Sequence, residues 1–185
     1  MNIPTDEKVA ELQKKYGCYD NMIEHMKLVG CLAKNIAQHL YNKGFDINPD
    51  LLQKAGFLHD IAKAKCLEKG GHHGEVGADI LEKEGFPEIA RLTRAHTGEI
   101  ILDENGIQKW LMQPIEEKIL ASADFHVTDK IVTLKERMDY LYKRYPKGKE
   151  KFDRLFIAHK RFEDILKEIA GFDYNKLINQ TDHPS

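Results

Sequence analysis

The stretch Ala55-Gly-Phe-Leu-His59-Asp60 decides how this sequence is interpreted, because an apolar run ends directly in a histidine and an aspartate. The apolar residues should lie in a hydrophobic core, where a neighbouring carboxylate is costly unless something neutralises it. A divalent metal would do so, and imidazole beside carboxylate suits Fe, Mn, Co, Ni or Zn better than Ca. Taken alone, however, the dipeptide favours the ordinary interpretation, which is a helix-end aspartate beside a packing histidine.

Two residues elsewhere in the chain, His25 and Asp124, change that balance. His25 lies one helical turn from Met22 and from Val29 on the apolar side of a predicted helix. Asp124 follows small residues at the end of another predicted helix, so a close approach to a neighbour is allowed. Each has an ordinary alternative, a core histidine or a local hydrogen bond. Together with His59 and Asp60 they form an ordered set that chance explains poorly, and we expect the four to hold a metal.

The apolar period is helical almost throughout and predicts an all-α, single-domain bundle of about six to eight helices. The domain should span residues 1–185, with the motif core at about 20–130 and C-terminal helices at about 131–178 completing it. Thr5, Asp20 and Asn48 are expected to cap helices. Residues 97–113 are expected to form a loop or lid, with strand-like alternation limited to Glu99–Leu102. The expected helices cover residues 6–16, 20–43, 49–60, 76–83, a segment from Pro87, 114–124, 132–145 and 150–170.

The composition is that of a globular protein, with 42% hydrophobic and 31% charged residues. The formal net charge of −2 predicts no strong attraction to nucleic acid or to a membrane. Neither a signal-like N-terminal stretch nor an apolar segment of membrane-spanning length is expected from the sequence. The cysteines Cys18, Cys31 and Cys66 are odd in number and lack CxxC spacing, so we expect no disulfide framework and a cytoplasmic location.

Several motifs together resemble the HD-domain superfamily of metal-dependent phosphohydrolases. His25-Met-Lys-Leu-Val29 is similar to the first histidine helix of that family. Ala55 to Lys63 is similar to its signature, although Ala62 stands where many members have glycine. His73-Gly-Glu-Val-Gly-Ala78 and Arg94-Ala-His96-Thr97 resemble the extra motifs of two-metal members, such as the bacterial hydrolases of symmetrical dinucleoside tetraphosphates.

A second resemblance concerns the segment from Ser122 to Arg137. It is similar to HD domains that are sometimes attached to molybdenum-cofactor nucleotidyltransferases, although the transferase is absent from this sequence. This similarity leaves the dinucleotide substrate open. We therefore expect a small phosphorylated substrate, a class that includes nucleotides.

The resemblance implies one or two divalent transition-metal ions per chain. Asp60 would be shared between them and would act in catalysis as well as in ligation. His25, His59 and Asp124 would complete one site. His73 and His96 would complete the other. A metal ion activates water for attack on a phosphate ester, because it neutralises the phosphoryl oxygens and lowers the pKa of bound water towards ~7.

Four cations are candidates for substrate binding. Lys63, the second candidate catalytic residue beside Asp60, lies one turn beyond it and would meet a substrate phosphate as a point charge, unless it is an ordinary solvated lysine. Arg94, Lys130 and Arg137 are further candidate phosphate contacts. The other histidines fit a loop (His72) or surface and packing positions. Those remaining histidines are His39, His126, His159 and His183.

Some features leave alternatives open. Trp110 and Phe125 are core residues unless they cover a nucleobase. The basic residues from Lys143 to Lys151 fit a solvated helix junction, with a phosphate-rich partner as the alternative. The same metal ligands would serve a di-iron oxygenase, and a non-catalytic binding or signalling domain is a third option. Homo-oligomerisation is also left open.

Overall fold

A computed structural model describes residues 2–181, which are helical nearly throughout, so the predicted all-α class is confirmed. Within this range, no helix is long and apolar enough to cross a membrane. His183 lies outside the described residues. The helices are α1 (Asp6–Lys15), α2 (Asp20–Asn42), α3 (Pro49–Leu58), α4 (Lys63–Lys69), α5 (His73–Lys83), α6 (Pro87–Ala95), the 3-10 helix η1 (Glu99–Leu102), α7 (Gly106–Leu111), α8 (Ile115–Phe125), α9 (Leu134–Arg144), the 3-10 helix η2 (Pro146–Gly148), α10 (Lys149–Ala170) and α11 (Tyr174–Thr181).

The helices α2 and α3 cross with their backbones in contact, because each has a glycine at the crossing. A Cβ added to Gly56 would lie 2.3 Å from the Cα of Gly30. A Cβ added to Gly30 would lie 2.4 Å from the ring of Phe57. No side chain fits there without separating the helices. This close crossing brings the C-terminal end of α3, where His59 lies, against the first half of α2.

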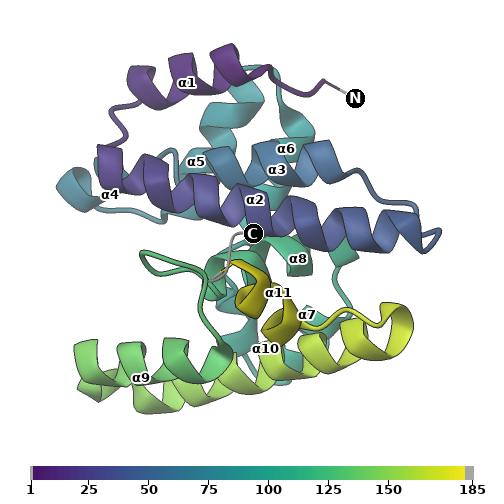
Figure 1. The fold of residues 1–185 in the computed structure, drawn as a ribbon. Helices are drawn as coiled ribbons and strands as arrows, with labels where there is room; N and C mark the ends of the chain where they lie inside the picture. The colour runs from purple at the N-terminus through teal and green to yellow at the C-terminus, as the bar shows by residue number, and fades with distance from the viewer. Residues whose placement is uncertain (1, 182–185) are drawn as a thin grey trace.

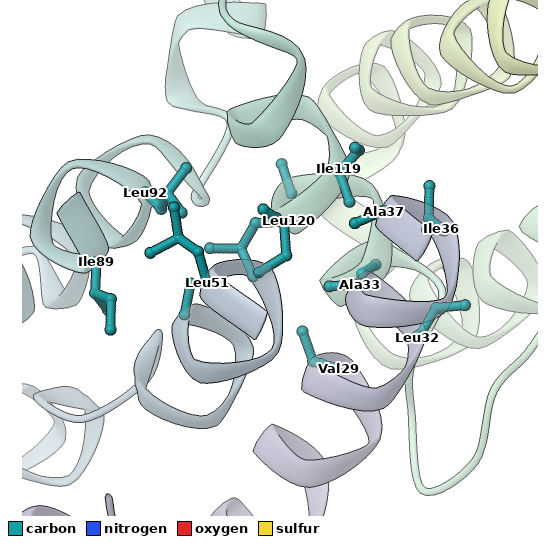
Figure 2. Packing of buried hydrophobic residues seen from close by; sticks show 14 of the residues in the cluster. Val29, Leu32, Ala33, Ile36, Ala37, Leu51, Ile89, Leu92, Ile119 and Leu120 are labelled. Atoms are coloured by element: carbon teal, nitrogen blue, oxygen red, sulfur yellow. The ribbon is translucent and has the colours of Figure 1, made fainter. Parts of the chain in front are cut away.

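The main core lies where α2, α3, α6 and α8 meet. Figure 2 shows Leu120 of α8 between Ala33 of α2 and Leu51 of α3. These side chains are almost completely buried. Helix α8 therefore runs through the middle of the molecule, and its last residues reach the same region as the end of α3.

The helices α9 and α10 lie side by side in a second layer, below α2 and α3 in the view of Figure 1. The apolar side chains between them form a cluster of their own. It contains Phe125, Leu134, Met138, Leu141 and Phe152. The second half of α10 joins the main core instead, where Phe162 packs against Trp110. Trp110 is 2% exposed and is therefore a core residue.

Several predicted boundaries differ from the structure. Thr5 and Asn48 cap α1 and α3 as expected, but Asp20 is the first residue of α2 and the N-cap is Tyr19. Helix α5 begins at His73, three residues before the predicted start at Val76. Within residues 2–181, three short helices (α4, α7 and α11) add to those expected.

The segment 97–113 is not the irregular loop or lid that the sequence predicts. Residues Glu99–Leu102 form a 3-10 helix and not a strand, and α7 follows it. Gly98 has a φ of 63°, which turns the chain into η1. Arg154 of α10 donates hydrogen bonds to the carbonyl oxygens of Ile101 and Asp103. This segment is therefore fixed to α10, and Trp110 anchors it in the core.

Candidate metal centre

Six side chains from five helices or helix ends converge on one point. His25 comes from α2 and Asp124 from the last turn of α8, while His59 and Asp60 follow α3. His73 is the first residue of α5, and His96 follows α6. Three overlapping sets of ligand atoms lie within 4.8 Å of one another. They are His25, His59 and Asp60; His59, His96 and Asp124; and Asp60, His73 and His96.

The first part of the site is built around Asp124. Its Oδ1 lies 2.9 Å from the Nε2 of His25 and 3.5 Å from the Nε2 of His59. The Nε2 of His59 is also 3.5 Å from the Oδ2 of Asp60. The rings of His25 and His59 have centroids 5.5 Å apart, as the close crossing of α2 and α3 requires. These four residues are the set that the sequence predicts for the first ion.

The second part of the site is built around the other oxygen of Asp60. The Oδ1 of Asp60 lies 3.3 Å from the Nε2 of His73 and 3.8 Å from the Nε2 of His96. The two histidine Nε2 atoms are 3.2 Å apart. The carboxylate of Asp60 therefore faces both groups, one oxygen towards each. This arrangement is the one that sharing Asp60 between two ions would need.

Hydrogen bonds at the ends of α3 and α6 orient two of the imidazoles. The Nδ1 of His59 lies 2.8 Å from the carbonyl oxygen of Gly56, and the Nδ1 of His96 lies 2.5 Å from that of Thr93. A carbonyl accepts only from an N–H, so each Nδ1 carries a proton. The neutral ring then presents the Nε2 lone pair to the centre, which is the form that a metal ligand needs.

The residues present fit a divalent transition metal. Among the described residues, the buried Nε2 of His59 and the buried Oδ1 of Asp60 have no hydrogen-bond partner. Unpartnered polar atoms are costly in a protein interior. Both atoms face the centre, and a cation would satisfy both. A set of imidazole nitrogens and carboxylate oxygens is typical of Zn, Fe, Mn, Co or Ni.

The electrostatics of the site favour the ligand forms of most of these groups. Burial lowers the pKa of His96 to about 4 and also lowers the pKa of His73. Burial would raise the pKa of Asp124, but the hydrogen bond from His25 and the nearby charge of His59 hold it well below its ordinary value. At neutral pH, His73 and His96 are thus neutral and Asp124 is ionised, as ligation requires.

His59 is different, because its pKa is raised. Burial acts to lower it, but the charges of Asp60 and Asp124 outweigh burial. Without a cation, the two carboxylates favour a proton on this ring. A metal ion would neutralise the same carboxylates and would compete with that proton.

Lys63 lies at the edge of the centre, and its Nζ is 2.5 Å from the Oδ2 of Asp60. The side chain is 41% exposed, so the ammonium also meets solvent. Burial acts to lower the pKa of Lys63, but the charges of Asp60 and Asp124 raise it. The nearby positive charge of Arg137 acts against these carboxylates. Lys63 therefore stays charged at the open side of the site.

The other predicted phosphate contacts differ in their surroundings. Arg94 forms ion pairs with Glu75, Asp79 and Glu82 of α5 on the surface, so its charge is already neutralised. Lys130 is exposed in the loop after α8. Arg137 lies over the ring of Phe125, next in sequence to Asp124. The structure thus places Lys63 and Arg137 close to the centre, whereas Arg94 is paired with the carboxylates of α5.

The remaining histidines and aromatic residues mostly pack, as the sequence predicts. His126 stacks on Tyr174. Phe125 is 7% exposed and stacks on the buried ring of His159. His39 lies 2.8 Å from the carbonyl oxygen of Ala170. His72 faces solvent and pairs with Glu99.

Sequence reasoning misses two features of this region. One is the crossing of Gly30 and Gly56, two small residues far apart in the sequence whose meeting no local pattern reveals. The other is a cavity of about 220 Å³ beside His73, between α5, α6, η1 and α7. Its lining includes Thr97, Ile100 and Gln113. The sequence treats these residues as part of an irregular loop, which hides the cavity.

Comparisons with known proteins identify relatives of this chain. The uncharacterized protein MJ0778 of Methanocaldococcus jannaschii is 31% identical over 169 residues, which cover 87% of this chain and 98% of that protein. The tRNA (cytidine(56)-2'-O)-methyltransferase of Thermoplasma volcanium is 32% identical over 184 residues. That match covers 95% of this chain, which spans only 50% of the methyltransferase.

A similarity over a shorter stretch links this chain to ribonuclease Y of Aquifex aeolicus. It is 38% identical over 89 residues, which are 48% of this chain and 15% of the ribonuclease. No solved structure matches the chain significantly. The sequence profile described as HD domain matches residues 22–132, which include all six side chains of the centre. With His25, the His59–Asp60 pair and Asp124 meeting as that family's motif requires, the chain belongs to the HD-domain family.

Proposed function

We propose that this protein is a metal-dependent phosphohydrolase acting on a phosphate ester, a class that includes nucleotides and dinucleotides. The observation that carries this proposal is the position of Asp60, whose two oxygens face two groups of ligands. His25, His59, Asp60 and Asp124 would hold one divalent ion. Asp60, His73 and His96 would hold the second. When bound, such ions supply Lewis acidity towards phosphoryl oxygens and water that is acidic enough to act at neutral pH.

The protein's own side chains would bind and orient the phosphate. The ammonium of Lys63 has three donors and no acceptor, so it cannot ligate metal while protonated. Asp60 neutralises part of the positive charge of Lys63. The exposed side of the Lys63 ammonium would donate a hydrogen bond to a non-bridging phosphoryl oxygen. Asp60 thereby holds the lysine beside the reacting group, which reduces the entropy lost on substrate binding.

Similarity to one relative also supports phosphate-ester hydrolysis. The name ribonuclease describes cleavage of phosphodiester bonds in RNA by that relative. The alignment with that relative covers 89 residues, which are 48% of this chain. The methyltransferase is matched over half of its length, so its named activity is not carried over to this chain.

A screen with metal-loaded protein tests the proposal. Protein loaded with Mn or Fe is incubated with phosphorylated metabolites and with the diester bis-p-nitrophenyl phosphate, and phosphate or nitrophenol release is measured. We expect turnover in wild-type protein, loss of turnover in Asp60→Ala, and wild-type turnover in the exposed control Asp46→Ala. Oxygen uptake by the iron-loaded protein is recorded in parallel. Oxygen uptake without release of phosphate or nitrophenol would contradict hydrolysis.

A further inference from the structure

Two arginines and two tyrosines alternate along one flank of α9 and its C-cap, Tyr145. The guanidinium carbon of Arg137 lies 5.6 Å from the ring centroid of Phe125 and 5.7 Å from that of Tyr140. The guanidinium carbon of Arg144 lies 6.0 Å from the ring centroid of Tyr140 and 5.6 Å from that of Tyr145. We call Arg137, Tyr140, Arg144 and Tyr145 the Arg–Tyr row. Its members form a continuous series of cation–aromatic contacts.

Packing of the fold accounts for only part of this row, since among its members Tyr145 contacts the core, with its ring centroid 6.1 Å from that of Phe152. The face of α9 that packs against α10 carries Leu134, Met138 and Leu141, which are nearly buried. Tyr140 is 42% exposed and Tyr145 is 49% exposed. Large aromatic rings held at a surface between arginines are typical of a surface that binds a partner.

The two arginines of the row are also free of acidic partners. Neither forms an ion pair with a carboxylate in the part of the chain that the structure describes, whereas Arg94 forms three. The buried Nε of Arg137 has no hydrogen-bond partner among these residues. A partly buried guanidinium without a counter-charge is costly, which points to an anionic ligand.

The charge around the row has the opposite sign to that of the whole chain. Residues 130–151 contain eight lysines and arginines but only three acidic residues, whereas the chain as a whole has a net charge of −2. The whole-chain value averages over this difference and conceals it. A positive surface with exposed aromatic rings suits a polyanion that also carries flat apolar groups.

One end of the row lies beside the end of α8, the helix that supplies Asp124 to the metal centre. Phe125, the first ring of the series, directly follows Asp124. Arg137 lies over the Phe125 ring, so this end of the row is beside the last turn of α8, which carries Asp124. Figure 1 shows α9 extending from the middle of the molecule to one side of the α9–α10 layer. Over the seven residues from Arg137 to Arg144, the helix advances roughly 10 Å. The row therefore leads outward from the site of the proposed chemistry.

We propose that the Arg–Tyr row binds single-stranded nucleic acid and leads the strand to the metal centre. Bases would stack on Tyr140 and Tyr145, and backbone phosphates would contact Arg137 and Arg144. A duplex keeps its bases stacked on each other, so it cannot use the tyrosines in this way. The inference rests on the proposed function, because the strand would supply the phosphodiester that the centre hydrolyses.

Fluorescence anisotropy with labelled oligonucleotides of about 12 nucleotides tests this proposal. The 185-residue chain is titrated in EDTA, which prevents cleavage, into single-stranded RNA, single-stranded DNA and duplex RNA. The variants are Tyr140→Ala, Arg144→Ala and the conservative Tyr140→Phe. Tyr41→Ala and Arg161→Ala are matched controls, because both residues are exposed and lie outside the row. The same proteins, loaded with Mn, are assayed for hydrolysis of bis-p-nitrophenyl phosphate.

We expect wild-type protein to prefer a single strand to a duplex. Loss of one stacked base corresponds to about 10-fold weaker binding, which we expect for Tyr140→Ala and not for Tyr140→Phe. Arg144→Ala should weaken binding and reduce its salt dependence. Tighter binding of RNA than of DNA would identify RNA as the ligand, and the reverse would identify DNA.

Equal affinity for single strand and duplex, or unchanged affinity in Tyr140→Ala, would overturn the proposal and leave a nonspecific cationic surface. Hydrolysis of the small diester separates this failure from failure of the proposed function. If the diester is hydrolysed normally while binding does not depend on the row, only the present inference is wrong. If the diester is not hydrolysed, the proposed function fails whatever the binding result.

Discussion

At the scale of single residues, two histidines of the centre are oriented by the same kind of local hydrogen bond. His59 and His96 both follow the last turn of a helix, and each donates its Nδ1 proton to the carbonyl three residues earlier. Carbonyls at a helix C-terminus lack intrahelical partners and are free to accept. Each bond fixes a ring orientation before any ligand arrives. The two Nε2 atoms are therefore preorganised towards Asp60.

Lys63 supplies a prediction at this scale. We expect Lys63→Ala to lower kcat/KM by about 10- to 100-fold, because a hydrogen bond to a charged group contributes about 1.5–3 kcal/mol. A fall in kcat would mean that the lysine acts mainly on the transition state, whereas a rise in KM would mean uniform binding. Metal content should not change. The exposed Lys65→Ala is the control, and wild-type kinetics in Lys63→Ala would show an ordinary surface lysine.

His159 predicts a pH effect on stability. Its ring is stacked on Phe125 and also contacts Trp110, and burial lowers its pKa to about 3. The pKa in the unfolded chain is near 6.5. As the pH falls below 6.5, His159 binds a proton in the unfolded chain but stays neutral in the folded protein. The free energy of unfolding therefore falls with decreasing pH, by up to about 1.4 kcal/mol per unit.

His159→Phe should remove this contribution, because phenylalanine keeps the aromatic stack and does not titrate. Between pH 7 and pH 5, we expect the variant to lose about 2 kcal/mol less of its free energy of unfolding than wild type loses. Urea unfolding at the two pH values measures this difference, with His72→Ala as an exposed control. Parallel losses in wild type and His159→Phe would show that the buried ring is not the source.

At the scale of elements, the centre depends on how closely α2 and α3 cross. We expect Gly56→Ala to lower the free energy of unfolding by roughly 1–3 kcal/mol, because a methyl group cannot fit against Gly30. Metal affinity should fall as well, because separating the helices moves His59 away from His25. Urea unfolding and metal titration check both effects. Cys31→Ala, an exposed change beside Gly30, is the control. Unchanged stability in Gly56→Ala would mean that the crossing is loose.

Local sequence signals predict most of the elements but not how the elements meet. Asn48-Pro49 fixes the start of α3, and apolar spacing fixes the length of α2. Such signals fail for α7, which is short and lies in a stretch without a clear period. The metal ligands can be proposed from the order of the histidines and aspartates along the chain and from the resemblance to the HD-domain superfamily. The pairing of Arg94 with carboxylates of α5, and the lack of a partner for the Nε of Arg137 among the described residues, depend on tertiary contacts that one sequence does not reveal.

At the scale of the whole molecule, the centre lies where two layers of helices meet. The helices α2, α3, α5 and α6 supply the histidines and Asp60 on one side, and α8 supplies Asp124 between this layer and the α9–α10 layer. The cationic α9 and Lys63 lie at one edge of the centre, and the cavity beside His73 lies at another. A substrate could thus extend from the centre in two directions with different chemistry.

The metal-to-protein ratio, measured by inductively coupled plasma mass spectrometry after loading with excess Mn or Fe, tests the central claim most directly. With Asp60 shared, we expect about two ions per chain in wild type and about one in His96→Ala. Asp60→Ala should retain none while keeping its helical circular dichroism spectrum. Wild-type occupancy in Asp60→Ala, or a wild-type ratio that never exceeds one, would contradict a two-ion centre built around Asp60.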